Sequence, residues 1–247
     1  MLKEERFSKI VELVNEKGSL KTTEASETLG ISLATVRRDF NELDSMNKVV
    51  KVFGGVSSIK NAQYVTREDD MAHKASINTE EKDLIGKYAG SLIEDDDFVY
   101  MDAGTSVEAL IPYIKAENTS YMTNSISIGR KLSSLGMKVF ILPGEFKAET
   151  EALVGASTCE FLQNYNFTLG FFGTNGIHKE IGFTTPDVNE AMVKTKALSR
   201  CKKAYVLADK SKYGKISQVT FSADPDLKII SNSDSGEIDV RTYKEDI

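Results

Sequence analysis

Between residues 80 and 231, short apolar runs alternate with segments of helical period. This alternation restricts the fold more than any other feature, because strands separated by helices pair in parallel and carry helices on both faces of the sheet. We therefore predict a mainly parallel α/β domain. The predicted strands, with the turns that follow them, lie at 97–106, 120–125, 138–144, 167–177, 203–214 and 227–231, and the predicted helices at 80–93, 107–116, 126–136, 157–165 and 186–201.

Small, hydroxyl, amide and cationic residues follow these predicted strands. Ligands of open α/β sheets bind beyond the carboxyl ends of the strands. Gly104 allows close backbone approach there, and Thr105 and Ser106 stand at an expected helix N-terminus, which favours anions. The site expected for a phosphorylated polyol contains Asp102, Gly104, Thr105, Ser106, Thr123, Asn124, Ser125, Gly144, Lys147, Gly173, Asn175, Gly176, Asp209, Lys210 and Lys212. Each motif taken alone also fits an ordinary turn, a helix cap or a solvated lysine.

Residues 1–58 show a different pattern. Helical spacing predicts helices over 3–17, 22–29 and 32–44, and Gly18 and Gly30 follow the first two. Thr22 or Thr23 is expected to cap the second helix, and Ser32 the third. The run 48–55 alternates like a strand and ends in two glycines. Two short helices joined by a tight turn, followed by a strand, indicate a winged helix-turn-helix.

The helix expected over 32–44 has two distinct faces. Leu33, Val36, Phe40 and Leu43 are expected to face the other helices. The opposite face suits the major groove, where Arg pairs with guanine and Asn with adenine. The residues expected to contact DNA are Ser32, Ala34, Thr35, Arg37, Arg38, Asn41, Lys48 and Lys51. A simpler alternative is that Arg37 and Arg38 only form surface ion pairs with Asp39 or Glu42.

Charge and composition agree with this division. The chain of 247 residues has a net charge of −6, but residues 1–60 are close to neutral. We predict a DNA-binding domain at 1–58, a polar and partly helical linker at 59–78, and a sensing domain at 79–247. No apolar run is long enough for a membrane helix, and the charged N-terminus is unlike a secretory signal. The two cysteines are expected to be reduced in the cytoplasm, and neither cysteines nor histidines have metal-ligand spacing, so no cofactor is expected.

The motifs "ERFSKIVELVNEKG", "ISLATVRRDFNEL" and "KVFGG" resemble the winged helix-turn-helix of the DeoR family of bacterial transcription regulators. The body resembles the family's effector domain through "DAGTS", "TNS", "PGEF", "GTNGI", "GFTTPDVNEAMVK" and "LADKSK". That domain is similar in fold to ribose-5-phosphate isomerase. Phe40 stands where the family commonly has Leu. Phe53 stands where it commonly has His, which removes a polar residue from the wing.

This resemblance implies an oligomeric repressor, a homodimer or homotetramer, that binds operator DNA and responds to a phosphorylated sugar. The family's phosphate loop falls on 104–106, and further pocket positions fall on Asp102, Asn124, Asn175, Glu190 and Lys212. The motifs are most similar to those of fructose and lactose repressors, which favours fructose 1-phosphate or tagatose 6-phosphate as effector. The alternative is a sugar-phosphate isomerase with an accessory DNA-binding head. We favour a regulator that is not an enzyme, because a catalyst has no need of such a head.

Overall fold

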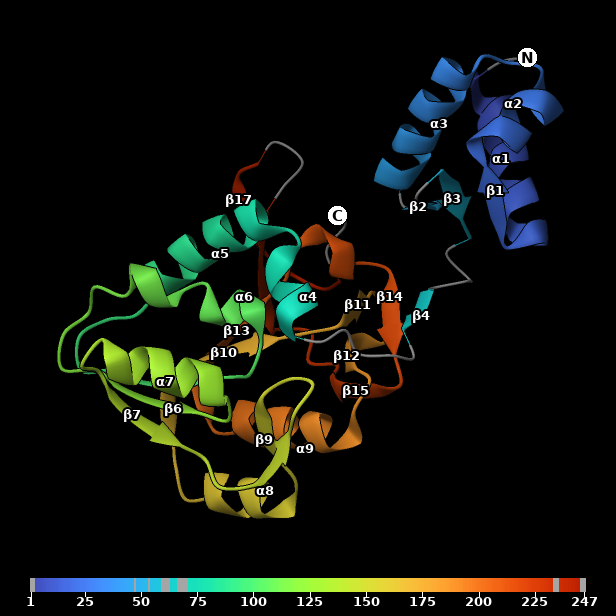
Figure 1. Cartoon of the computed structure of the whole chain (residues 1–247). Coiled ribbons are helices and arrows are strands. Elements are labelled where there is room, and N and C mark those ends of the chain that lie inside the picture. The colour runs from blue at the N-terminus through green and yellow to red at the C-terminus, as the bar shows by residue number, and fades with distance from the viewer. Residues whose placement is uncertain are drawn as a thin grey trace. The chain divides into compact units, whose positions relative to one another are not determined.

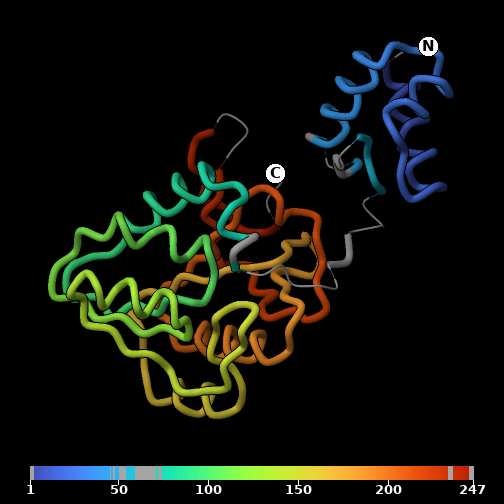
Figure 2. Tube along the Cα trace, viewed as in Figure 1, coloured from blue at the N-terminus to red at the C-terminus, as the bar shows by residue number. Residues whose placement is uncertain are grey.

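The computed structural model describes residues 3–46, 48–52, 54–58, 63–65, 71–232 and 236–244, without the side chains of 45, 50–52, 63–65, 72 and 73. The chain divides into two compact units, Met1–Tyr64 with Asp246–Ile247 and Val65–Glu245 (Figure 1). Figure 2 traces the chain in the same view. Each unit has its own apolar core.

The first unit is a three-helix domain with a small sheet. Helices α1 (Lys3–Lys17), α2 (Thr22–Leu29) and α3 (Leu33–Ser45) enclose a core that includes Ile10, Val14, Ala25, Val36, Phe40 and Leu43. Strands β1 (Ser19–Lys21), β3 (Gly55–Ser57) and β2 (Val50–Val52) form an antiparallel sheet in that order. This arrangement confirms the predicted winged helix-turn-helix.

The ends of α2 and α3 follow the expected glycine and serine, with two differences. Gly30 ends α2 with φ 65°, and Ser32 Oγ accepts the Thr35 N–H at 3.2 Å. The predicted threonine cap of α2 is wrong, because Lys21 holds the N-cap position and the Thr22 hydroxyl donates to the Gly54 carbonyl at 3.0 Å. Leu33 is 43% exposed rather than buried, because the first turn of α3 extends past the apolar core.

The second unit is built on a seven-stranded sheet of order β17-β16-β13-β10-β5-β6-β7. Its strands are parallel except β17, which pairs antiparallel with β16. The mainly parallel sheet predicted from the alternating pattern is therefore confirmed. The strands are β5 (Phe98–Met101), β6 (Ser120–Thr123), β7 (Lys138–Ile141), β10 (Phe167–Gly173), β13 (Cys201–Leu207), β16 (Lys228–Asn232) and β17 (Ile238–Thr242).

Helices cover both faces of this sheet (Figure 1). The period of two along each strand divides the apolar residues between two clusters. Val99 and Met101 of β5 join the cluster under α5 (Thr79–Ser91) and α7 (Ile126–Ser134), whereas Tyr100 joins the cluster under α8 (Ala156–Leu162) and α9 (Val188–Leu198). Shorter helical segments are α4 (Met71–Ser76), α6 (Thr105–Glu108), η2 (Ile111–Tyr113) and η3 (Lys210–Lys212).

Several local elements differ from the predictions. The helix predicted over 107–116 is instead the short α6 followed by the 3-10 turn η2. Pro112 supplies the reason, since it has no N–H to continue the helical ladder. Short strands in the connecting loops were not predicted, namely β4 (Gln63–Val65), β8 (Glu145–Lys147), β9 (Ala152–Val154), β11 (Gly176–His178), β12 (Gly182–Thr185), β14 (Lys215–Ser217) and β15 (Val219–Ser222).

Helix α5 packs unusually close to the backbone that follows α6. A Cβ added to Gly86 would lie 2.4 Å from the Ala109 carbonyl oxygen, and one added to Gly90 would lie 2.8 Å from Tyr113 Cβ. Real Cβ atoms do not approach other atoms so closely, so both positions require glycine as long as the backbone stays in place. These contacts fix α5 against the segment that contains α6 and η2.

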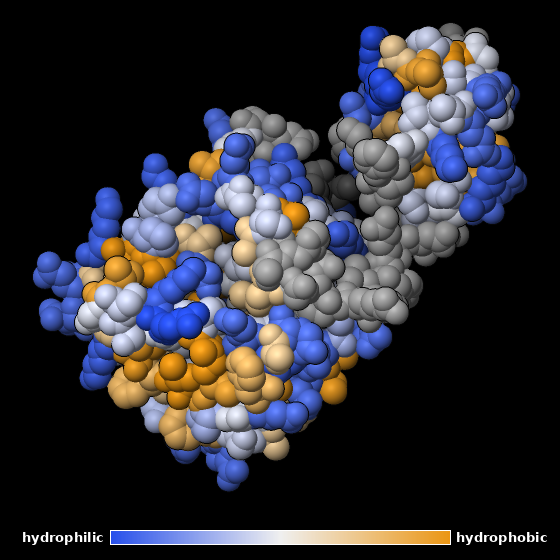
Figure 3. Space-filling model, in the orientation of Figure 1, coloured by the Kyte–Doolittle hydropathy of each residue, from blue (hydrophilic) through white to orange (hydrophobic). Residues whose placement is uncertain are grey.

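The surface of the second unit is not uniformly polar. Apolar side chains gather on the part of this unit that carries β7 and α8 (Figure 3). Phe140 and Ile141 of the edge strand β7 are 43% and 44% exposed, and Phe146 is 53% exposed. At the opposite edge of the sheet, β17 pairs with β16.

Candidate functional site

Helix α3 presents a polar face to solvent. Val36, Phe40 and Leu43 are buried, and Ala34, Arg37, Arg38 and Asn41 are exposed. Thr35 is half-buried, and its hydroxyl lies 2.9 Å from that of Ser32. The predicted DNA-contacting residues of the helix therefore share one accessible side.

Asp39 and Glu42 of α3 pair with α1, and the two arginines stay exposed. Asp39 is 2% exposed and accepts a hydrogen bond from Arg6 Nη2 at 2.9 Å. This hydrogen bond raises the pKa of the Arg6 guanidinium. Glu42 pairs with Lys3. Within the described residues no ion pair involves Arg37 or Arg38, so the structure does not contain the surface pairs of the simpler alternative.

Fewer of the predicted DNA-contacting side chains are described in the wing than in α3. Lys48 is exposed just before β2. The side chain of Lys51 and the whole of Phe53 lie outside the described residues. Contacts of the wing with DNA therefore stay a prediction.

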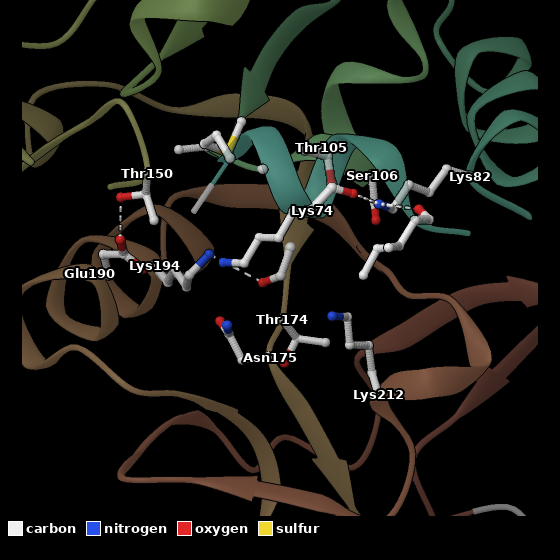
Figure 4. A pocket seen from close by; sticks show the side chains of 15 residues that line it. Lys74, Lys82, Thr105, Ser106, Thr150, Thr174, Asn175, Glu190, Lys194 and Lys212 are labelled. Atoms are coloured by element: carbon white, nitrogen blue, oxygen red, sulfur yellow. Dashed lines mark hydrogen bonds between the residues drawn. The ribbon is translucent and has the colours of Figure 1, made fainter. Parts of the chain in front are cut away.

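A pocket in the second unit lies at the carboxyl ends of the central strands (Figure 4). Seven of the predicted effector-binding residues line it, namely Gly104, Thr105, Ser106, Gly173, Asn175, Glu190 and Lys212. The hydroxyls of Thr105 and Ser106 have no hydrogen-bond partner among the described residues. The pocket also contains residues that were not predicted, namely Met71, Lys74, Ile77, Lys82, Ala103, Thr150, Thr174 and Lys194.

A buried ion pair forms the base of this pocket. Asp102 is 1% exposed and Lys194 is 4% exposed, and the Lys194 ammonium donates to the Asp102 carboxylate. Lys194 also donates to the Gly173 carbonyl at 3.1 Å, and the Gly173 N–H donates to Asp102 Oδ2 at 3.0 Å. Burial raises the pKa of the Asp102 carboxyl, and Lys194 opposes that rise. Asp102 therefore positions Lys194 and the end of β10.

Glu190 is the acidic residue of the pocket wall. It is 6% exposed and accepts hydrogen bonds at Oε1 from Thr150 Oγ1 at 2.7 Å and from Lys147 Nζ at 3.0 Å. Lys147 also lies 3.4 Å from Asp187, which caps α9 by accepting the Glu190 N–H at 2.9 Å. Lys147 thus supports the carboxylate from behind and does not line the cavity.

Lys82 holds the opposite side of the pocket. It is 5% exposed, and its ammonium donates to the carbonyls of Ile77, at 2.9 Å, and Lys74. Burial lowers the pKa of Lys82, and the nearby Asp209 opposes that shift. In Figure 4 the side chains of Lys74 and Lys212 reach into the same hollow. Four lysines and one glutamate line the pocket, so its lining carries an excess of positive charge, which favours anions.

The other predicted effector residues make local contacts outside the cavity lining. Asn124 Oδ1 accepts the Ala103 N–H at 3.0 Å, and its Nδ2 donates to the Leu153 carbonyl at 3.3 Å. Thr123 accepts the Ser125 N–H, and Ser125 caps α7. Added Cβ atoms at Gly144 and Gly176 would meet Thr158 Oγ1 and the Lys215 carbonyl. Asp209 accepts the Ser211 N–H, and the Lys210 N–H donates to Glu81.

The sequence contains different signals for the three pocket lysines that were not predicted, Lys74, Lys82 and Lys194. Lys194 follows Glu190 by four residues, which places both on one face of the predicted helix 186–201. Lys82 likewise lies in the predicted helix 80–93. Lys74 falls in the predicted linker, where no periodicity marks it.

The comparisons with known proteins match both units. The model of the DeoR C terminal sensor domain matches residues 77–232, and that of the DeoR-like helix-turn-helix domain matches residues 6–62. The chain belongs to the DeoR family. This family consists of transcription regulators rather than enzymes, which removes the isomerase alternative and makes this DeoR-family chain a DNA-binding regulator with a sensor domain.

Individual relatives agree with this assignment. The chain is 35% identical over 246 residues to the HTH-type transcriptional regulator FruR of Bacillus subtilis, covering 99% of this chain and 96% of the relative. It is 36% identical over 218 residues to the lactose phosphotransferase system repressor of Staphylococcus epidermidis, covering 87% and 86%. The corresponding repressor of Staphylococcus aureus is 33% identical over 247 residues, covering 99% and 97%.

Solved structures similar to the DeoR-family chain include ribose-5-phosphate isomerases. The enzyme of Methanocaldococcus jannaschii aligns with a TM-score of 0.41 and 13% identity over 55% of each chain.

Among the described residues no helix is long and apolar enough to cross a membrane, and no group of three metal-ligating side chains is present.

Proposed function

We propose that this DeoR-family regulator represses a sugar-utilisation operon and leaves its operator when a phosphorylated sugar binds. The observation that carries the proposal is the pocket, which is lined by Lys74, Lys82 and Lys212 together with Thr105 and Ser106. Ammonium groups and hydroxyls are suitable partners for a phosphate. Helix α6 has four residues, so in this proposal the lysines rather than a helix dipole supply the attraction.

Fructose 1-phosphate and tagatose 6-phosphate are the effectors we favour. This choice rests on the motifs of the chain and on the regulator FruR and the lactose phosphotransferase system repressor among its relatives. Asn175, which follows β10, and Glu190, on α9, have the amide and carboxylate groups that sugar hydroxyls prefer.

In this proposal, Arg37, Arg38 and Asn41 read base edges of the operator, and Lys48 and Lys51 contact phosphates. The regulator acts in the cytoplasm as a homodimer or homotetramer, because two helix-turn-helix domains read two half-sites. We retain 1–58, 59–78 and 79–247 as the DNA-binding domain, linker and sensing domain. The effector binds the DNA-free form of the regulator more tightly than the operator-bound form. This difference in binding free energy, typically about 1–3 kcal/mol, is the amount by which the effector weakens operator binding.

A gel-shift experiment tests this function. The full chain is mixed with the DNA upstream of its own gene at low salt, and fructose 1-phosphate, tagatose 6-phosphate or unphosphorylated fructose is then titrated in. We expect a retarded band that one of the phosphorylated sugars removes and free fructose does not. Absence of a retarded band would contradict the regulator proposal, and a band that no phosphorylated sugar alters would contradict the effector.

A further inference from the structure

The outer edge of β7 differs from the other edge of the seven-stranded sheet. β17, at the opposite edge, carries the ion-paired Asp239 and Arg241. β7 begins with Lys138, and apolar residues make up the rest of the strand. Edge strands that stay unpaired are usually protected by charged side chains or proline, because their free N–H and C=O groups otherwise pair with another strand. None of the described strands pairs with the outer edge of β7, which lacks the protection that β17 has.

The apolar area around β7 and α8 (Figure 3) reaches both faces of this sheet edge. On one face, Phe140 packs edge-on against Phe98, with ring centroids 6.4 Å apart. Phe98 also contacts Tyr165, which contacts Phe161 of α8. On the other face, Ile141 lies beside α7. Phe140, Phe161 and Ile141 are all exposed, and an apolar patch beside a free strand edge indicates an interaction surface.

The outward backbone groups of β7 belong to Val139 and Ile141. The Leu142 N–H donates to the Thr123 carbonyl of β6 at 2.9 Å. Backbone groups of successive residues in a strand point to opposite edges. Phe140 therefore also directs its N–H and C=O toward β6, whereas Val139 and Ile141 direct theirs outward. A strand that pairs here finds an N–H and a C=O on each of these two residues.

A second copy of β7 matches these groups. With a two-fold axis at Phe140, the two strands run antiparallel, and Val139 of each copy lies opposite Ile141 of the other. All outward backbone groups of both strands are then bonded, and the two Phe140 side chains face each other. The two Lys138 side chains lie at opposite ends of the pair, so no like charges meet. An axis at Val139 would instead bring Ile141 opposite Met137, which precedes the strand.

We propose that two sensor domains associate through the outer edges of their β7 strands, with Phe140 at the two-fold axis. The occupant of this edge is a second copy of the chain, because the strand is complementary to its own two-fold image in hydrogen bonding, apolar side chains and charge. For its biological purpose this inference rests on the proposed function, since two half-sites require two copies.

The assembly of the full-length chain tests this surface. Phe140→Asp places two carboxylates opposite each other at the axis, and should weaken association at least about a hundredfold, because like charges facing each other in an interface are costly. In sedimentation velocity at micromolar concentration, this variant should form particles of half the wild-type mass. Leu84→Asp, at an exposed apolar residue of α5, should assemble like the wild type. Circular dichroism shows whether both variants fold.

A cysteine cross-link tests the register without adding charge. Opposite residues of a non-hydrogen-bonded antiparallel pair have Cα atoms about 4.5 Å apart, within the range that a disulfide spans. Phe140→Cys should therefore form a covalent dimer under mild oxidation. Leu84→Cys and the wild type, whose two cysteines are half-buried, should not.

Three results would each overturn this inference: a wild type that sediments as a monomer, a folded Phe140→Asp that assembles like the wild type, or a Phe140→Cys that forms no cross-link. If Phe140→Asp does not fold, the cross-link decides. Assembly is measured without DNA, so its outcome is separate from the gel shift. A wild type that associates through β7 but retards no operator DNA would overturn the proposed function alone.

Discussion

The two anion-facing surfaces of this regulator are built in opposite ways. On α3, Arg37 and Arg38 extend into solvent, while Asp39 and Glu42 pair with α1. In the pocket, Lys82 and Lys194 are buried, and each ammonium donates to groups of the protein itself. The first surface keeps its cations available, and the second uses part of its cations to hold its own walls.

Because of this difference, the exposed cations of α3 are expected to affect operator binding, and the buried lysines of the pocket are expected to affect folding stability. Exposed cations on a fixed helix suit a large polyanion, whose binding weakens as salt rises. Buried and bonded lysines are screened less and support the surrounding structure. Substitutions at the base of the pocket should therefore alter folding, whereas substitutions on the outer face of α3 should alter operator binding and leave folding unchanged.

The largest effect is expected for Lys194→Ala. The substitution leaves Asp102 buried without its counter-charge and should lower the free energy of unfolding by about 3–5 kcal/mol at neutral pH. Because burial already raises the pKa of Asp102, loss of Lys194 raises it further, and stability falls as pH rises through that pKa. Urea unfolding should show the deficit shrinking toward about pH 4. The control Lys196→Ala, on the same helix, should lose under about 1 kcal/mol.

Arg6→Ala tests whether the first unit also depends on a buried carboxylate. Asp39 would lose its partner, and we expect a loss of about 3 kcal/mol in the unfolding transition of that unit. Lys3→Ala removes the exposed pair between the same two helices and should cost less than about 1 kcal/mol. Equal losses in the two variants would show that burial of Asp39 does not decide the stability.

Arg38→Ala and Arg37→Ala probe the exposed face. If the guanidinium reads a base, each should weaken operator binding by about 1–3 kcal/mol with no change in the unfolding curve. Fluorescence anisotropy at several salt concentrations measures the affinity and its salt dependence. The assignment of this helix face is wrong if both variants bind operator like the wild type.

The smallest effect is expected for two hydroxyls of the pocket. Thr105→Ala combined with Ser106→Ala should weaken binding of the sugar phosphate about tenfold or more, since each lost hydroxyl removes a hydrogen bond to the charged phosphate. Operator binding without sugar should be unchanged, and release should need more sugar. A variant that responds at the wild-type sugar concentration would place the phosphate elsewhere in the pocket.

The sequence predicted best those features that depend on neighbouring residues. The outer face of α3 follows from one helical period, and the Ser32 cap follows from a single position. The parallel sheet follows from the alternation of strands and helices. The helix expected over 107–116 was predicted wrongly, because Pro112 lies in its interior and has no N–H to continue the helix.

The pocket was predicted in part, for a physical reason. Gly104, Thr105 and Asn175 follow strands, and the order of strands in a sheet brings such residues together. Lys74 enters the pocket through carbonyl contacts with Lys82, which no local pattern records. Burial decided other cases. Asn124 bonds to backbone groups rather than lining the cavity, and Lys147 supports the Glu190 carboxylate from behind the pocket wall.

The close fit of α5 has a practical consequence for protein engineering. Gly86 and Gly90 lie against the backbone at Ala109 and Tyr113, and the start of α5 carries Lys82 of the pocket. In chimeras made from related sensors, residues 78–113 must be exchanged as one cassette. A junction placed inside this stretch would combine α5 from one sensor with the segment 109–113 from another, and the close packing at Gly86 and Gly90 would be lost.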